Sequence, residues 1–205
     1  MDVPELLTDG PADARHTLVL AHGAGAPMDS PFMAVFAASL AARGLRVVRI
    51  EFPYMAARRN GSRPGPNPPR VLQATWRTVI NRLGAEQLII GGKSLGGRVA
   101  SLVADEVGVA GLVCLGYPFH PPGRPDKLRT AHLATLRTPT LILQGTRDPL
   151  GAPDEVAGYT LSPAIRLHWL DDGDHSFKPR KASGRTEAQA WEEAITAIAD
   201  FAAAL

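Results

Sequence analysis

The chain has 205 residues and a single cysteine, and its 22 Lys plus Arg against 20 Asp plus Glu give a formal net charge of +2. This length and a 45% hydrophobic content predict one globular domain over residues 1–205 that folds without a metal or disulfide. The near balance of charge argues against a nucleic-acid partner, and no run of about 18 apolar residues is present to span a membrane. Asp2 and Glu5 stand where a leader segment would be basic, so we expect a cytoplasmic protein.

Six short apolar segments predict β-strands: Thr17–Ala21, Leu45–Phe52, Gln87–Gly91, Gly111–Leu115, Thr140–Gln144 and Ile165–Leu170. Most of them are nearly continuous apolar runs, which are typical of parallel strands covered on both faces. Between and after the strands, apolar residues at helical spacing predict four helices: Pro31–Ala42, Val71–Leu83, Leu95–Val107 and Thr186–Ala204. This alternation predicts an α/β fold with a mostly parallel sheet of about six strands and helices on both faces.

Two proline-rich stretches interrupt the pattern. Arg58–Pro69 and Pro118–Pro125 each contain several prolines, which exclude helix and strand through them. Both follow predicted strands, so we expect them at the carboxyl edge of the sheet, where open α/β folds bind ligands. Residues 116–139, between the fourth and fifth strands, are too few for a lid of several helices, so an open site for small substrates is expected.

The most informative motif is Gly92-Lys93-Ser94-Leu95-Gly96, between a predicted strand and a predicted helix. Gly-x-Ser-x-Gly in this context predicts a nucleophile elbow, a strained turn that exposes the serine hydroxyl. Glycines on either side of the serine avoid collisions in so sharp a turn. A phosphate-binding turn or a plain tight turn is the alternative, but the spacing Gly-x-x-x-x-Gly-Lys-Ser/Thr is absent. Ser94 is therefore the candidate nucleophile.

A serine nucleophile needs a base that a carboxylate orients. The acid and the histidine are expected in that order, each on a loop after a later strand. Asp148 follows the predicted strand Thr140–Gln144, and His175 follows Ile165–Leu170, so both positions match. His120, after the fourth strand, remains an alternative base and a candidate cavity residue. The alternative acids lie too close to His175 in sequence to sit comfortably behind its ring: Asp171, Asp172 and Asp174.

Acyl transfer also needs donors that hold the developing oxyanion. The N–H of Leu95 is one expected donor, and the glycine-rich turn after the first strand is expected to supply the other, from Ala24 or next from Gly25. Arg58 and Arg63, on the first proline-rich stretch, are candidate contacts for an anionic substrate because guanidinium groups bind carboxylates. The alternative for these arginines is a solvated loop. No His/Cys/Asp cluster has metal-ligand spacing, so we expect neither a metal nor a cofactor.

Four segments around these residues resemble the α/β-hydrolase superfamily, in the branch of the dienelactone hydrolases: Phe52–Met55, Gly91–Arg98, Leu115–Pro122 and Gln144–Asp148. The chain is similar over nearly its whole length to a bacterial group that also resembles a testis-expressed eukaryotic protein and a subunit of a chromatin acetyltransferase complex. The resemblance implies a small, lidless, three-layer α/β-hydrolase fold with Ser94, Asp148 and His175 as the catalytic triad. Dienelactone hydrolases carry cysteine at the position of Ser94, which puts a dienelactone substrate in doubt.

The sequence thus predicts a serine hydrolase that cleaves ester or related acyl bonds of small substrates through an acyl-enzyme. We expect a small-molecule acyl substrate, no membrane partner, and a monomer or homodimer. Two alternatives remain open. The first is a non-catalytic interaction module that keeps the fold, since fold does not imply activity. The second is an acyltransferase or perhydrolase, in which another acceptor replaces water on the same triad.

Overall fold

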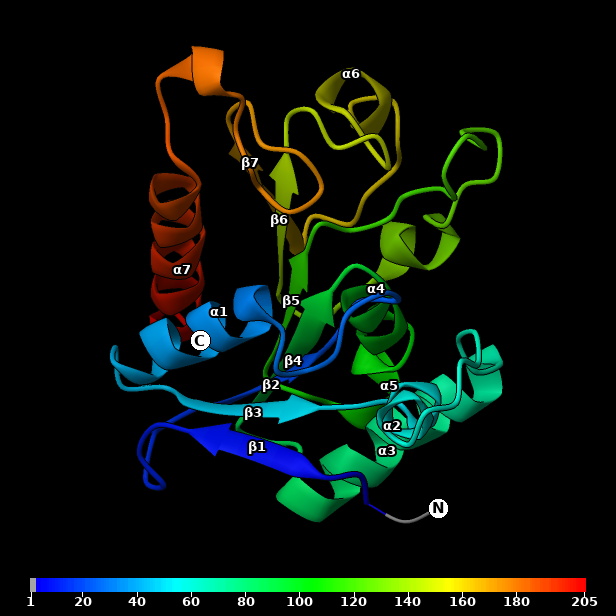
Figure 1. The fold of residues 1–205 in the computed structure, drawn as a ribbon, viewed down its shortest axis with the longest axis vertical. Helices are drawn as coiled ribbons and strands as arrows, with labels where there is room; N and C mark the ends of the chain where they lie inside the picture. The colour runs from blue at the N-terminus through cyan, green and yellow to red at the C-terminus, as the bar shows by residue number, and fades with distance from the viewer. Residues whose placement is uncertain (1–2) are drawn as a thin grey trace.

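A computed structural model describes residues 3–205 of the chain, so Met1 and Asp2 of the predicted domain lie outside the described residues. A central sheet has the strand order β1-β3-β2-β4-β5-β6-β7 (Figure 1). Its strands are β1 (Leu6–Asp9), β2 (Thr17–Ala21), β3 (Arg46–Ile50), β4 (Leu88–Lys93), β5 (Gly111–Leu115), β6 (Thr140–Gly145) and β7 (Ile165–Leu170). Neighbouring strands are parallel except for β1, which pairs antiparallel with β3. The mostly parallel sheet confirms the predicted fold class.

The six predicted strands are present, and β1 is an additional strand that the sequence analysis did not predict. β2, β5 and β7 have the predicted bounds, whereas β3 is shorter and β4 and β6 extend further at their carboxyl ends. β1 holds only four residues, too few for a period-two pattern to stand out. It is fixed by long-range contacts instead: Leu6 pairs with Ile50, and Arg49 donates to the Asp9 carboxylate at 2.9 Å.

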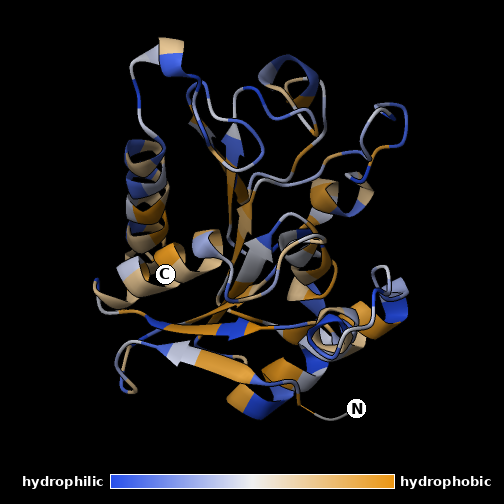
Figure 2. Ribbon diagram, viewed as in Figure 1, coloured by the Kyte–Doolittle hydropathy of each residue, from blue (hydrophilic) through white to orange (hydrophobic). Residues whose placement is uncertain are grey.

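Helices cover both faces of the sheet (Figure 1). One face packs against α1 (Pro31–Ala41) and α7 (Glu187–Ala203), and the other against α3 (Pro69–Leu83) and α4 (Leu95–Ser101). Alternate residues of β2 divide between the two layers, with Leu18 and Leu20 on the α1 and α7 side and Val19 on the other. Figure 2 shows hydrophobic residues along the central strands, as two covered faces require. This is the predicted three-layer arrangement.

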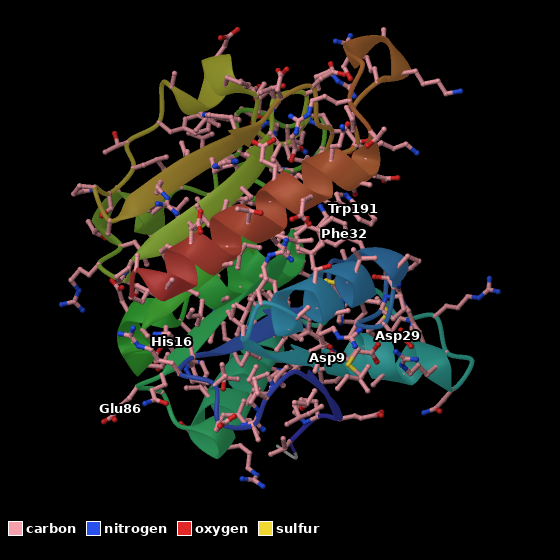
Figure 3. All side chains as sticks on the ribbon, turned by 90° about the vertical axis from the view of Figure 1, so that its left-hand side faces the viewer. Asp9, His16, Asp29, Phe32, Glu86 and Trp191 are labelled. Atoms are coloured by element: carbon pink, nitrogen blue, oxygen red, sulfur yellow. The ribbon has the colours of Figure 1, made fainter. Side chains whose placement is uncertain are left out.

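Helices α1 and α7 pack against each other on one face of the sheet. The two helices lie side by side in Figure 3, where Phe32 of α1 and Trp191 of α7 are labelled. Their rings meet edge to face with centroids 5.3 Å apart, a favoured geometry for aromatic pairs. Because α7 follows the loop after β7, this contact links that loop to the beginning of α1.

Three helical segments differ from the predictions. The expected helix Leu95–Val107 is divided into α4 and α5 (Ala104–Val107), and a helix α2 (Pro53–Arg59) includes the first residues of the stretch predicted to be irregular. That prediction is corrected at both ends of the stretch: Arg58 and Arg59 precede its first proline and end α2, and Pro69 occupies the first turn of α3, where proline is tolerated. Short turns complete the chain at η1 (Ala131–Thr135), α6 (Pro153–Val156) and η2 (Lys181–Ser183). Residues 116–139 hold η1 as their one helical turn, so this segment forms no lid, as predicted.

Candidate active site

Ser94 forms the turn between β4 and α4 at the carboxyl edge of the sheet. Its backbone has φ 49° and ψ −107°, a left-handed conformation that a residue with a side chain adopts only under strain. The turn is held by the Ser94 N–H, which donates to the Leu115 carbonyl of β5 at 2.9 Å. The strained conformation marks the turn as a nucleophile elbow in geometry.

The glycines around Ser94 are required by close backbone contacts. A Cβ at Gly92 would lie 2.0 Å from the Ala21 carbonyl oxygen, and one at Gly96 would lie 2.3 Å from the same atom. A Cβ at Gly97 would lie 2.6 Å from the Gly92 carbonyl oxygen. Since the obstructing atoms belong to the backbone of β2 and β4, they cannot move aside without disturbing the sheet. The motif is therefore explained by the packing of α4 directly against two strands.

Asp148 and His175 come from the loops after β6 and β7 and meet behind the elbow. His175 Nδ1 lies 2.7 Å from Asp148 Oδ2, and the Asp148 side chain is fully buried. The same oxygen accepts from Gln144 Nε2 at 2.9 Å, while Oδ1 accepts from the Leu150 N–H at 2.9 Å. Gln144 also accepts from the Tyr117 N–H at 2.8 Å, so it links the acid loop to the loop after β5.

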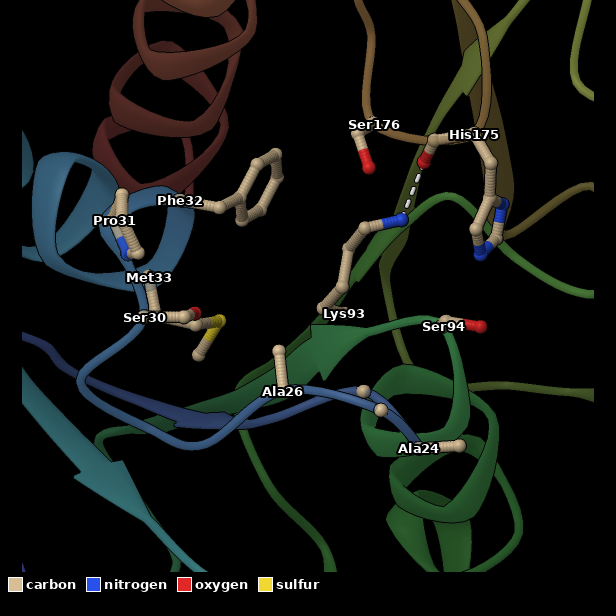
Figure 4. Close-up of a pocket in the computed structure, with 12 residues that line it drawn as sticks. Ala24, Ala26, Ser30, Pro31, Phe32, Met33, Lys93, Ser94, His175 and Ser176 are labelled. Atoms are coloured by element: carbon tan, nitrogen blue, oxygen red, sulfur yellow. Dashed lines mark hydrogen bonds between the residues drawn. The ribbon is translucent and has the colours of Figure 1, made fainter.

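The contact with Asp148 defines which nitrogen of the His175 ring carries its proton. An ionised carboxylate only accepts hydrogen bonds, so Nδ1 must donate. In the neutral ring the lone pair is then on Nε2. Figure 4 shows His175 and Ser94 on the same side of the cavity, with a ring nitrogen of His175 pointing toward the Ser94 side chain. The ring is oriented as a general base for that hydroxyl would be.

The alternative acids near His175 have other partners. Asp172 binds Arg180 and Arg147, and Asp174 Oδ1 accepts from the N–H groups of Ser176 and Lys178 at 2.8 and 3.0 Å. Asp171 is exposed. Of the four carboxylates considered, Asp148 is the one that the structure brings to the His175 ring.

A cavity of about 410 Å³ opens beside Ser94 (Figure 4). It lies between the turn after β2, the beginning of α1, the elbow and the His175 loop. The lining residues are Gly23, Ala24, Gly25, Ala26, Ser30, Pro31, Phe32, Met33, Lys93, Ser94, His175 and Ser176. Two predicted oxyanion donors, Ala24 and Gly25, are in this group. Among the hydrogen bonds within residues 3–205, none uses the N–H of Leu95 or Ala24, which leaves both free to bind a ligand.

The turn that contains Ala24 is held by two buried side chains that the sequence analysis did not assign to the site. His22 Nε2 accepts from the Phe52 N–H at 3.1 Å, and His22 Nδ1 lies 2.6 Å from the Gly23 carbonyl oxygen. Tyr54 Oη donates to the Ala24 carbonyl at 3.1 Å. These bonds require a neutral His22 with its proton on Nδ1, and burial, the largest cause, lowers the pKa of His22. The signal available in the sequence was a histidine directly before the glycine-rich turn.

The structure places three predicted substrate contacts, His120, Arg58 and Arg63, outside the lining of the Ser94 cavity. His120 is buried away from the Ser94 cavity, where its Nδ1 lies 2.9 Å from the Pro121 carbonyl oxygen and Nε2 lies 3.5 Å from Glu155. Arg58 instead donates to the Pro64 carbonyl at 2.8 and 3.0 Å and stacks over the Tyr54 ring. Arg63 is exposed, and both arginines line a separate surface depression. The local sequence placed these residues near the carboxyl edge but could not fix their side-chain direction.

Clusters of metal-binding side chains and membrane-spanning helices are both absent from residues 3–205. This part of the chain holds no group of three or more histidine, cysteine or acidic side chains arranged to bind a metal ion. None of its helices has the length and apolar character needed to cross a membrane.

Residues 14–203 match the family of the alpha/beta hydrolase domain, and the chain belongs to this family. A similar protein is the "Putative protein-lysine deacylase ABHD14B" of Rattus norvegicus, 31% identical over 115 residues. The aligned region spans 55% of this chain and 52% of the rat protein, so about half the length of that relative is matched.

Solved structures share the fold. A serine hydrolase without a lid from Xanthomonas campestris has a TM-score of 0.65 at 20% identity, covering 91% of this chain and 84% of that one. A dienelactone hydrolase from Anabaena variabilis has a TM-score of 0.70 at 21% identity, covering 96% and 89%. These likenesses confirm the predicted lidless fold and its resemblance to dienelactone hydrolases. The predicted similarity to testis-expressed and chromatin-complex proteins stays a prediction.

Proposed function

We propose that this protein is a serine hydrolase that cleaves ester or related acyl bonds of small substrates through an acyl-enzyme. The observation that carries the proposal is the 2.7 Å hydrogen bond between His175 Nδ1 and the buried Asp148 carboxylate, beside a serine in a strained elbow at one cavity. A nucleophile, a base and a group that orients the base are the three parts that acyl transfer through serine requires.

In the proposed reaction, His175 Nε2 takes the Ser94 hydroxyl proton while Ser94 Oγ attacks the substrate carbonyl carbon. The resulting imidazolium is stabilised by Asp148 and then gives the proton to the leaving alcohol as the tetrahedral intermediate breaks down. Water attacks the acyl-enzyme in the second half, with His175 again taking a proton and returning it to Ser94. Ser94 is thereby regenerated and the acid is released.

The oxyanion of the tetrahedral intermediate is assigned to the N–H groups of Leu95 and Ala24. Leu95 begins α4, so its N–H lies at the positive end of a helix. Ala24 belongs to the turn held by His22 and Tyr54. Donors fixed before the reaction lower the barrier because they need no reorganisation when charge develops.

Small substrates fit the dimensions of the site. The cavity of about 410 Å³ is near the lower end of the range for small-molecule sites, and residues 116–139 form no lid that would enclose a long acyl chain. The similarity to the rat protein favours a second candidate substrate, an acyl-lysine side chain of a protein. Its amide would react through the same steps, with an amine in place of the alcohol. Release of free lysine side chains from an acetyl-lysine peptide, measured beside ester hydrolysis, distinguishes the two substrate classes.

The test is covalent labelling by a fluorophosphonate probe, which reacts with an activated serine. We expect labelling of the wild type, none of Ser94→Ala, and loss of p-nitrophenyl acetate hydrolysis in the same variant. Ser101→Ala is the matched control, because Ser101 is a second serine whose Oγ lies 2.8 Å from a histidine ring nitrogen, that of His132, but it is buried outside the cavity. Labelling that persists in Ser94→Ala, or a folded wild type that is not labelled, would refute the proposal.

A further inference from the structure

Lys93 is the elbow residue directly before Ser94, and its ammonium group lies on the wall of the cavity (Figure 4). Nζ donates to the backbone carbonyl of His175. It lies 5.6 Å from the ring centre of Phe32 and 5.8 Å from that of Phe177. Within residues 3–205, Lys93 is the only lysine or arginine that lines this cavity. A single cation therefore sits among mainly apolar walls, next to the proposed nucleophile.

The charge of Lys93 is incompletely compensated. Asp148 and Asp174 are close enough to favour the ammonium form, but Asp148 binds His175, Gln144 and the Leu150 N–H. Asp174 accepts from two N–H groups of its own loop. In the part of the chain that the structure describes, Lys93 makes no ion pair with a carboxylate. Burial outweighs the two carboxylates and lowers the pKa of Lys93 to about 8.

The single hydrogen bond to His175 does not by itself require a cation at this position. An ammonium group has three N–H donors, and the structure gives one of them a protein acceptor, the His175 carbonyl. A neutral donor would support that carbonyl without the free-energy cost of desolvating a charge. A carboxylate bound in the cavity would supply both the missing negative charge and a strong, charge-assisted acceptor.

We propose that Lys93 binds a carboxylate of the substrate, so that the preferred substrates are esters with a carboxylate a short spacer away from the scissile carbonyl. This inference rests on the proposed hydrolase function and adds its substrate class. Lys93 and Ser94 are consecutive residues that line the same cavity, so one small substrate can reach both of them. The proposed contact orients the substrate and leaves the covalent steps unchanged.

The test compares each anionic ester with a neutral ester of the same shape. Monomethyl succinate and methyl 4-oxopentanoate differ by a carboxylate against a methyl ketone on the acyl side. Acetoxyacetate and acetoxyacetone make the same comparison on the alcohol side. The readout is the ratio of kcat/KM for the anionic ester to that for the neutral one, measured by titration of released acid. Because both esters are measured with the same variant, the ratio is unaffected by a general loss of activity, which is what a purely structural role of Lys93 would cause.

In the wild type we expect the anionic ester to be preferred in at least one pair. Lys93→Met and Lys93→Gln should reduce that ratio about 10- to 100-fold, because a hydrogen bond to a charged group is lost. Lys93→Gln retains an N–H donor for the His175 carbonyl, and Lys93→Arg, which retains the charge, should keep most of the preference. Thermal unfolding identifies any variant that fails to fold, and the wild-type ratios test the proposal without a variant.

The inference is overturned if the wild type prefers neither anionic ester, or if the ratio is unchanged in folded Lys93→Met and Lys93→Gln. These outcomes are separate from failure of the proposed function. Hydrolysis of the neutral esters that disappears in Ser94→Ala would support the serine mechanism even where the preference for anions is absent. Turnover that survives in Ser94→Ala would reject the mechanism itself.

Discussion

Replacing Asp148 by asparagine tests the hydrogen-bond network behind His175. The carboxylate is fully buried, and both of its oxygens accept hydrogen bonds. Oδ2 receives His175 Nδ1 at 2.7 Å and Gln144 Nε2 at 2.9 Å, whereas Oδ1 receives the Leu150 N–H at 2.9 Å. Asparagine offers one accepting oxygen and one NH₂ group that only donates. In either orientation of the amide, its NH₂ group faces N–H donors of the protein and cannot accept a hydrogen bond from them.

The two orientations of the amide have different consequences for His175. With NH₂ toward Leu150, a buried backbone N–H loses its acceptor. With NH₂ toward the ring, Nδ1 must accept, and the proton moves to Nε2, where it blocks removal of the Ser94 proton. An unpaired buried donor costs about 1–3 kcal/mol of unfolding free energy, or roughly 2–12 °C in Tm for a domain of this size. The wrong tautomer lowers kcat by roughly 10³- to 10⁴-fold.

The assay combines thermal unfolding with steady-state hydrolysis of p-nitrophenyl acetate below the Tm of each variant. Asp171→Asn is the matched control, since it makes the same substitution at an exposed carboxylate of the His175 loop, and we expect wild-type kcat and Tm. An Asp148→Asn variant that keeps both kcat within about tenfold of the wild type and the wild-type Tm would contradict this hydrogen-bond network, because one orientation of the amide lowers kcat and the other lowers stability.

Three further predictions follow from close contacts and shifted pKa values. Gly96→Ala places a Cβ 2.3 Å from a backbone oxygen of β2 and should lower the unfolding free energy in urea by about 1–3 kcal/mol or more, whereas Gly65→Ala, with open space around it, should not. Burial lowers the pKa of His22 below its ordinary 6.5. As pH falls, His22 therefore binds a proton in the unfolded chain before it does so in the folded protein. The stability that neutral His22 contributes is complete above pH 6.5 and is lost below it. Urea unfolding should therefore show a smaller loss in His22→Gln over this range, and an equal loss would contradict the assignment. Because the pKa of Lys93 is about 8, the preference for anionic esters should fall as pH rises through that value in the wild type but persist in Lys93→Arg; a flat wild-type profile would count against the Lys93 contact.

Much of the fold follows from local patterns. The continuous apolar runs that became β2, β5 and β7 have the predicted bounds, because a buried parallel strand needs apolar residues on both faces. The elbow was also recognisable locally, since its glycines and the strand before it are neighbours in sequence. Two short elements were not predicted from the sequence. β1 has only four residues, too few for an alternating pattern to be recognised, and α2 was not predicted because of the prolines around it.

The positions of Asp148 and His175 on loops after their strands could be predicted, because parallel strands bring such loops to one edge of the sheet. The pairing of the two side chains, 27 residues apart, depends on contacts that join separate loops. The same holds for His22 and Tyr54, which hold the Ala24 turn from different elements, and for Arg58, which turns to its own loop.

The amino-acid sequence alone determined six of the seven strands, the class of fold and the elbow serine, because these features depend on patterns among residues that are close in the sequence. Tertiary structure alone decided which side chains face the cavity, including the ammonium group of Lys93. The direction of a side chain is set by packing against residues that are distant in the sequence, so it cannot be predicted from residue spacing within one segment.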